Sequence, residues 1–283
     1  MLTCPICHTP LKRNNTIFEC SQHHTFDIAK EGYVNLVTRK LSTSVGDTKE
    51  MLQARRSFLN AGLYRPLSDA LNAHVVNDLP QVQPHHADGE ATLLDVGCGE
   101  GYYLGQLQSF LKEQRVDKNI IFFGLDISKE AIRIAARRYK NIQFMVADLK
   151  ERLVFADSSL HLLLNIFAPR NIAEFARVLV PNGIVIVVIP GTQHLRQLRE
   201  TLPLLNIQEN KAQHVEEQFA PYFKHLTTSS INYTLRLTQQ EAEQVVMMTP
   251  NYWHLSNEIR QRLKVIQGME TEVAFVMLIF QKR

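Results

Sequence analysis

The chain has 283 residues, of which 45% are apolar and 21% charged, and its formal net charge is +3. This composition excludes a wholly disordered protein, and no uninterrupted apolar run approaches the roughly 20 residues that a membrane-spanning helix needs. A net charge this small does not by itself indicate a nucleic-acid partner. Because the first residues lack the basic start and long apolar stretch of a signal peptide, we expect a cytoplasmic protein with reduced thiols.

The first 90 residues contain two predicted helices between polar stretches. Residues 30–47 are polar and predict a loop or linker. Apolar residues at helical spacing predict helices over 49–59 and 66–79, and the second begins at a proline, which favours the first helical turn. A polar stretch over 81–90 follows and marks a boundary with the rest of the chain.

From residue 92 onward, apolar stretches of strand length alternate with helical patterns. Strands are predicted over 92–96, 120–125, 142–146, 160–166, 184–189, 231–237 and 272–281. Helices are predicted over 128–139 (capped by Ser128), 172–180 (ended by Pro181), 194–202 and 240–248. This alternation is typical of an α/β protein whose parallel sheet is doubly wound, with helices on both faces.

Three of the four cysteines lie in the first twenty residues. Cys4 and Cys7 form a CxxC pair, and Cys20 is followed four positions later by His24. Two close pairs of thiolate and imidazole ligands suit tetrahedral zinc, and a segment of about 30 residues is too short to fold on its own core. We therefore predict a structural zinc site on these four residues. The alternatives for the fourth ligand are His23 and His8. A redox-active CxxC is the alternative function of the first pair.

A glycine-rich turn directly follows the strand predicted over 92–96. Its glycines are spaced GxGxG, which differs from the GxGxxG of dinucleotide-binding proteins, and a helix follows. Glycine lets the backbone approach a ligand closely, and a helix N-terminus favours electronegative groups. The turn therefore predicts a cofactor site. The alternative is an ordinary tight turn that binds no ligand.

Three acidic residues stand beside the ends of successive predicted strands. Asp95 precedes the glycine-rich turn, Asp126 ends the second strand, and Asp148 follows the third. A carboxylate at Asp126 can accept both ribose hydroxyls, and one at Asp148 can meet an adenine. This order of acids and glycines predicts S-adenosylmethionine as the cofactor.

Four motifs are distributed over nearly the whole chain. They are the cysteine and histidine pairs followed by residues 26–36, the stretch 51–67, the glycine-rich turn within 94–103, and residues 248–253. Together they resemble the bacterial 23S ribosomal RNA guanine-N1 methyltransferases. The resemblance implies a Rossmann-like class I methyltransferase sheet with a small N-terminal zinc-binding module.

The resemblance also implies an activity and a set of cofactor contacts. The activity is methyl transfer from S-adenosylmethionine to N1 of a guanine in a hairpin of 23S ribosomal RNA, by a homodimer whose zinc module helps to bind the RNA. The residues that would surround the cofactor are Tyr64, Asp95, Gly97, Gly99, Tyr103, Leu104, Asp126 and His194. The alternative for His194 is a capping or surface histidine.

The family that the chain resembles has two branches, which methylate neighbouring guanines of the same hairpin. One branch is linked to macrolide resistance, and we favour the other, which is common in Gram-negative bacteria. A small-molecule methyltransferase with a structural zinc module is an alternative from a different class. A non-catalytic RNA-binding relative is a third.

Guanine N1 lies on the Watson–Crick edge, so the enzyme must expose that edge to modify it. Asn165, at the end of a predicted strand, is the predicted residue for positioning the base, and no proton acceptor is assigned. Tyr252 and Trp253 are candidates for stacking on a base, with core packing as the alternative for Trp253.

Cations of the first 65 residues are candidates for phosphate contacts, because this part of the chain has nine basic and five acidic residues. The candidates are Arg39, Lys40, Lys49, Arg55 and Arg56. For Arg55 and Arg56 we weigh RNA or cofactor contact against a solvated helix face. We divide the chain into a zinc-binding RNA-recognition module (1–36), a linker and helical segment (37–90) and a methyltransferase domain (91–283).

Overall fold

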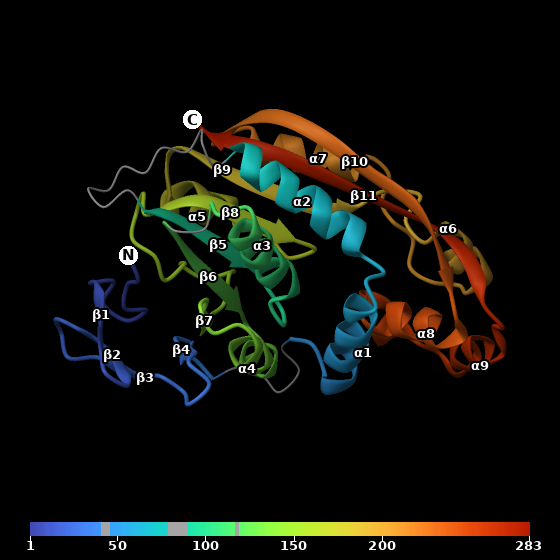
Figure 1. Cartoon of the computed structure of the whole chain (residues 1–283), viewed down its shortest axis with the longest axis horizontal. Helices are drawn as coiled ribbons and strands as arrows, with labels where there is room; N and C mark the ends of the chain where they lie inside the picture. Colours follow the sequence, from blue (N-terminus) through green and yellow to red (C-terminus); the bar gives the residue numbers. More distant parts are fainter. Residues whose placement is uncertain (41–45, 79–89, 117–118) are drawn as a thin grey trace.

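The computed structural model describes residues 1–40, 46–78, 90–116 and 119–283. Its centre is an eight-stranded sheet with the order β10-β11-β9-β8-β5-β6-β7-β4 (Figure 1). In chain order its strands are β4 (Val34–Asn35), β5 (Ala91–Val96), β6 (Ile120–Asp126), β7 (Gln143–Val146), β8 (Leu160–Ile166), β9 (Leu179–Pro190), β10 (Phe223–Leu237) and β11 (Met269–Lys282). Parts of the polar stretches predicted over 30–47 and 81–90, namely 41–45 and 81–89, lie outside the described residues.

Helices cover both faces of the sheet, which confirms the predicted doubly wound α/β fold (Figure 1). One face packs against α1 (Lys49–Asn60), α2 (Arg65–Asp78), α3 (Tyr102–Glu113), α4 (Lys129–Arg138), α6 (Arg196–Thr201), α8 (Gln239–Met247) and α9 (Asn257–Val265). The other face packs against α5 (Ile172–Val178) and α7 (Lys211–Phe219). Strand β8 illustrates the division, because Leu162 and Leu164 join the first core and Leu163 joins the second.

The sheet is mixed, whereas the alternation of strands and helices predicts a parallel one. Strands β4 to β9 pair in parallel, but β11 runs antiparallel to β9, and β10 runs antiparallel to β11. The alternating pattern of residues 231–237 predicts a strand, but such a pattern does not indicate whether the strand runs parallel or antiparallel to its neighbours. Sheets of this class commonly have an antiparallel edge strand.

The helix predicted over 172–180 ends two residues early, at Val178, and Pro181 lies inside β9. The residue before a proline favours an extended backbone, so Val180 continues a strand more readily than a helix. The pairing of β8 with β9 shifts register here: Leu160 faces Leu179 and Leu162 faces Ile184. The predicted cap of α4 is confirmed, because the Ser128 hydroxyl accepts a hydrogen bond from the Ala131 amide.

The N-terminal module is a three-stranded antiparallel sheet of β1 (Leu11–Asn14), β2 (Ile17–Cys20) and β3 (Thr25–Asp27). Residues that flank its strands attach it to the rest of the chain, to the segment before β8 and to the edge of the central sheet. The Thr3 amide donates to the Val154 carbonyl over 2.9 Å, and β4 pairs in parallel with β7. The loop predicted over 30–47 was therefore wrong at β4. A strand of two residues is too short to show an alternating pattern in the sequence. None of the described helices is long and apolar enough to cross a membrane.

Candidate functional site

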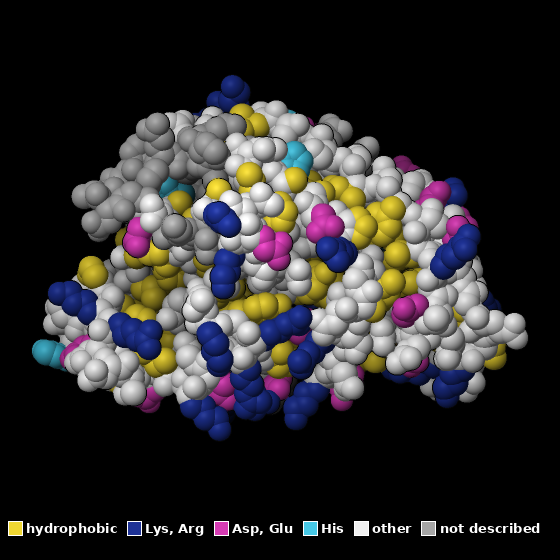
Figure 2. Space-filling model, in the orientation of Figure 1, with side chains coloured by type: hydrophobic (Ala, Val, Ile, Leu, Met, Phe, Trp, Pro, Cys, Tyr) yellow, Lys and Arg dark blue, Asp and Glu magenta, His cyan; other side chains and the backbone are white. Residues whose placement is uncertain are grey.

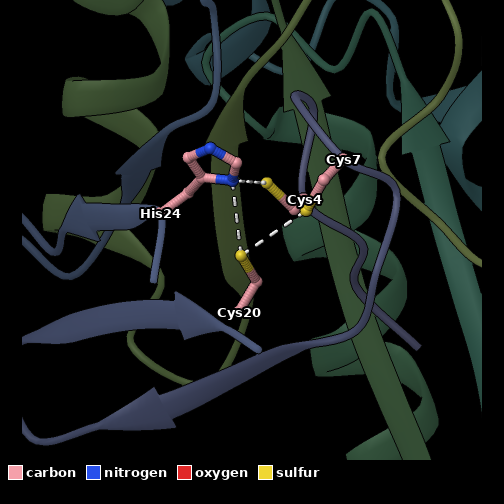
Figure 3. A group of neighbouring side chains, drawn as sticks. All are labelled: Cys4, Cys7, Cys20 and His24. Carbon is pink, nitrogen blue, oxygen red and sulfur yellow. Dashed lines mark hydrogen bonds between the residues drawn. The ribbon is translucent and has the colours of Figure 1, made fainter. Parts of the chain in front are cut away.

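Four side chains of the N-terminal module converge on one point (Figure 3). Their ligand atoms all lie within 4.8 Å of one another. His24 Nδ1 is 3.6 Å from the sulfur of Cys4 and 3.5 Å from that of Cys20, and the sulfurs of Cys7 and Cys20 are 3.6 Å apart. Tetrahedral zinc with Zn–S bonds of about 2.3 Å places its ligand atoms about 3.6–3.8 Å apart, so the four residues fit the ion.

The surroundings of the cluster distinguish it from the alternatives. His23 is exposed and turns its Nδ1 to Glu19 over 3.2 Å, away from the sulfurs. The side chain and backbone of Thr9 lower the pKa of Cys7 to about 7, which favours the thiolate that zinc binds. Because protein atoms fill all four positions, the site has no open place for a substrate, which is the arrangement of a structural zinc.

The glycine-rich turn between β5 and α3 forms a tight cradle against the chain that leaves β8. Gly97 has a φ of 74°, and a Cβ there would lie 2.5 Å from the Cβ of Ala168. Gly99 has a φ of 55° and Gly101 a φ of 78°. Left-handed backbone angles require glycine at all three positions, and at Gly97 the close approach of Ala168 leaves no space for a side chain.

Two of the predicted acids lie beside this cradle. Asp126 uses both carboxylate oxygens on backbone amides, 2.9 Å from Gly99 N and 2.8 Å from Ser128 N. Asp95 is buried, and its Oδ1 has no hydrogen-bond partner among the described residues. Burial and the neighbouring Asp126 raise the pKa of Asp95 to about 8. A buried carboxyl oxygen without a partner in the described residues, beside a glycine-rich turn, is a feature of a site that binds a cationic ligand.

His194 is buried, which excludes the alternative of a surface histidine. Its Nε2 lies 3.1 Å from the hydroxyl of Tyr64, and its ring packs against Phe275 at 4.6 Å. Burial lowers the pKa of His194 to about 3, so the ring is neutral. Its Nδ1 has no partner in the part of the chain that the structure describes. Leu104, on α3, is by contrast fully buried in the core.

The turn after β8 is fixed by Asn165. Its amide Nδ2 donates to the Pro169 carbonyl over 2.8 Å, while its Oδ1 has no partner among the described residues. Phe167, which the sequence patterns did not single out, has a φ of 54° and a side chain that is 44% exposed. Its ring centroid lies 5.3 Å from that of Phe275 and 6.4 Å from that of Tyr103. Its position two residues after Asn165 is the signal that could have identified it.

Glu100 is a second residue that the sequence patterns did not single out. It is buried within the glycine-rich turn, and neither carboxylate oxygen has a partner within the described residues. Burial raises the pKa of Glu100 to about 7, against the opposing effect of nearby arginines. An acid inside a glycine-rich turn is a signal in the sequence that could have identified it.

The structure separates the predicted RNA contacts into two groups. Arg39 pairs with Asp148, so two predicted functional residues engage each other, and Arg55 pairs with Asp47. The remaining candidates are exposed, namely Lys40, Lys49 and Arg56. Trp253, on the 3-10 helix η2 (Pro250–His254), is 56% exposed and packs edge-on against Tyr252, which excludes the alternative of core packing.

Comparisons with known proteins identify both parts of the chain. A family model described as "Methyltransferase domain" matches residues 87–247, and a zinc-ribbon model described as "RlmA, N-terminal" matches residues 2–42. The chain is therefore a methyltransferase with an N-terminal zinc ribbon. These matches confirm the predicted cofactors, S-adenosylmethionine and a structural zinc ion.

The relatives define the family more narrowly. The 23S rRNA (guanine(748)-N(1))-methyltransferase of Streptomyces fradiae is 34% identical, and the match covers 95% of this chain and 91% of that protein. A relative from Micromonospora griseorubida, provisionally named a 23S rRNA (guanine-N(1)-)-methyltransferase, is 36% identical over 89% of this chain and 87% of its own. YxjB of Bacillus subtilis, with the same provisional name, is 31% identical over 100% and 97%. The chain belongs to the 23S rRNA guanine-N1 methyltransferase family.

Proposed function

We propose that this protein transfers a methyl group from S-adenosylmethionine to N1 of a guanine in a hairpin of 23S ribosomal RNA. The observation that carries the proposal is the match to the Streptomyces fradiae enzyme over nearly the whole length of both chains. The zinc ribbon supports an RNA substrate over a small molecule, because the relatives named for 23S rRNA match the chain through both of its parts.

The site residues have distinct tasks in this proposal. Bound S-adenosylmethionine supplies the electrophilic methyl group. The glycine-rich turn and Asp126 hold the cofactor, with Asp126 fixing the shape of the turn through its bonds to two backbone amides. His194 is neutral and buried, so it adds no positive charge that would repel a sulfonium.

Asn165 positions the target base. Its Nδ2 fixes the turn after β8. Its Oδ1, which is buried and has no partner among the described residues, would accept a hydrogen bond from an N–H group on the Watson–Crick edge of guanine once the base enters the site. The exposed ring of Phe167 lies at the same edge of the sheet and offers a stacking surface. Holding the base in line with the methyl group supplies much of the rate, since the sulfonium is already a good leaving group.

The phosphates of the RNA backbone would bind to exposed Lys and Arg side chains outside the cofactor site. Figure 2 shows Lys and Arg side chains gathered along the lower edge of one face, below the sheet in the view of Figure 1. Lys49 and Arg56, on α1, are exposed, as is Lys40. Such contacts bind phosphates without reading sequence, so they set affinity and salt dependence.

Methyl transfer to a synthetic hairpin tests the proposal. We expect incorporation of labelled methyl groups into the hairpin, and loss of incorporation when one particular guanine is replaced by adenosine. Primer extension then reports the position, because N1 methylation blocks base pairing. Asn165→Ala should lower the rate about 10- to 100-fold while the affinity for the cofactor stays within about twofold. Absence of transfer to any guanine, in the hairpin or in ribosomal particles, would contradict the proposal.

We further propose that the protein acts in the cytoplasm as a homodimer, and that the division at residues 36 and 90 separates its functional parts. The cytoplasmic location follows from the proposed ribosomal substrate. Light scattering coupled to gel filtration tests the dimer, for which a mass of about twice 32.5 kDa is expected.

A further inference from the structure

Arg55 lies over the glycine-rich turn, away from the exposed cations of α1. A Cβ built on Gly99 would be 3.5 Å from Arg55 Nη1, so the guanidinium stands where a side chain of the turn would point. Its own side chain is only 25% exposed. The neighbouring Arg56, in contrast, is exposed on the same helix. Of these two arginines, Arg55 is therefore the one directed at the cofactor cradle.

A contact close in sequence and one far away hold the Arg55 guanidinium in place. Nη1 pairs with the carboxylate of Asp47, and Nη2 donates to the Met248 carbonyl over 3.1 Å. The segment around Asp47 itself lies against the chain that leaves β6, because a Cβ at Gly46 would be 3.1 Å from the Cβ of Ser128. The guanidinium is thus fixed from both sides above the turn and is not a mobile surface charge.

The charge of Arg55 also acts on ionisable groups of the cradle. Burial raises the pKa of both Asp126 and Glu100, and the positive charge of Arg55 opposes that increase at Asp126 and, after the larger effects of Arg138 and Arg56, at Glu100. Arg55 likewise opposes the increase that burial causes in the pKa of Tyr103. One guanidinium is therefore within electrostatic range of three side chains of the cofactor site.

The charges of the cradle complement those of S-adenosylmethionine. The cofactor has two cationic groups, the sulfonium and the α-ammonium, and one anionic group, the α-carboxylate. The unpartnered carboxyl oxygen of Asp95 suits the α-ammonium group as a hydrogen-bond acceptor, and the guanidinium of Arg55 suits the α-carboxylate. A guanidinium has five N–H donors, of which the described contacts use two. The remaining N–H groups can donate to both oxygens of a carboxylate.

We propose that Arg55 binds the α-carboxylate of S-adenosylmethionine and is a cofactor-binding residue, not an RNA-phosphate contact. The inference rests on the proposed use of this cofactor but not on the identity of the methyl acceptor. Asp47 and the Met248 carbonyl act as positioning groups, since they orient the guanidinium before the cofactor arrives.

A ligand that lacks only the carboxylate tests the proposal. Calorimetry would compare the binding of S-adenosylmethionine and decarboxylated S-adenosylmethionine to the full-length protein and to Arg55→Met. The unaltered protein should bind the complete cofactor about 10- to 100-fold more tightly than the decarboxylated one. Arg55→Met should bind the two about equally. The matched control Arg65→Met removes an exposed arginine at the start of α2 and should keep the full preference.

The remaining outcomes are equally decisive. Preference for the carboxylate that persists in Arg55→Met would overturn the proposal, as would equal losses of affinity for both ligands. If Arg55→Met does not fold, Arg55→Lys retains the charge without the planar fork and should show a reduced preference. An unaltered protein that binds both ligands equally also overturns it. A protein that shows the preference but methylates no RNA would contradict the proposed function alone.

Discussion

The zinc cluster and the cofactor cradle use polar side chains in opposite ways. At the zinc cluster, four ligand atoms face one another within 4.8 Å, and each is committed to the same point. At the cradle, buried polar atoms of Asp95, Asn165 and Glu100 have no partner among the residues that the structure describes. Since an unpaired buried polar group costs about 1–3 kcal/mol, the chain maintains these atoms at a cost in stability.

This contrast separates a site that completes the fold from a site that awaits a ligand. The zinc ribbon has little core of its own, so its ligands replace the missing core with metal bonds. The methyltransferase sheet has two large cores and can tolerate unsatisfied groups at its edge. Disturbing the first site should therefore unfold local structure, whereas disturbing the second should change binding more than folding.

Removing a zinc ligand should have the largest effect. Cys20→Ser should lower the zinc content from about one ion per chain to near zero and expose β1, β2 and β3, because structural zinc supplies folding free energy directly. Elemental analysis and hydrogen exchange measure the two effects. His23→Ala, at the exposed neighbouring histidine, should retain the zinc. Full zinc retention in Cys20→Ser would contradict the assignment.

Filling the cradle should have the next largest effect. Gly97→Ala combines a positive φ with a contact of 2.5 Å to Ala168, so we expect a loss of about 2–4 kcal/mol in the free energy of unfolding. Gly62→Ala has a similar φ of 79° but nothing within 4 Å, and it should cost about 1 kcal/mol. Urea unfolding compares them. Equal losses would mean that the close approach to Ala168 is unimportant.

Asp126→Ala should weaken cofactor binding about 10- to 100-fold, because it removes both the ribose acceptor and the bonds that shape the turn. The fold should survive, since the two cores of the sheet are untouched. Calorimetric titration gives the affinity, and Asp69→Ala, at an exposed acid of α2, is the control. Unchanged affinity would exclude Asp126 from the cofactor site.

The last expected effect concerns the pH dependence of stability. The pKa of Asp95 is raised from 3.8 to about 8, so between these values the folded state binds a proton that the unfolded state has lost. Stability from this group is therefore greatest at low pH and declines as the pH rises toward 8. Asp95→Asn should flatten that decline, by on the order of 1–3 kcal/mol between pH 5 and pH 8 in denaturant unfolding. An unchanged pH profile would mean that Asp95 is ionised in the folded protein.

Local chemistry made much of the molecule predictable. The zinc ligands are close in sequence, and Asp95, Asp126 and the glycine-rich turn stand at strand ends, where sheet geometry brings them together. For Arg55 the sequence left cofactor contact, RNA contact and a solvated helix face open, and it did not indicate Asp47, because their placement depends on how α1 and the residues before it pack against the end of α8 and the chain after β6. The direction of β10 and β11 likewise depends on pairing between segments far apart in sequence.

The short strand β4 limits how this protein can be divided or recombined. Val34 and Asn35 pair with the outer edge of β7, and the Leu36 amide continues the pairing to the Val146 carbonyl over 2.9 Å. A fragment that starts at residue 37 would leave the β7 edge open to association with other chains. An exchange of zinc ribbons between relatives must therefore keep β4 with the sheet that it closes. The cut then falls before residue 33, a few residues ahead of the functional boundary that we propose at residue 36.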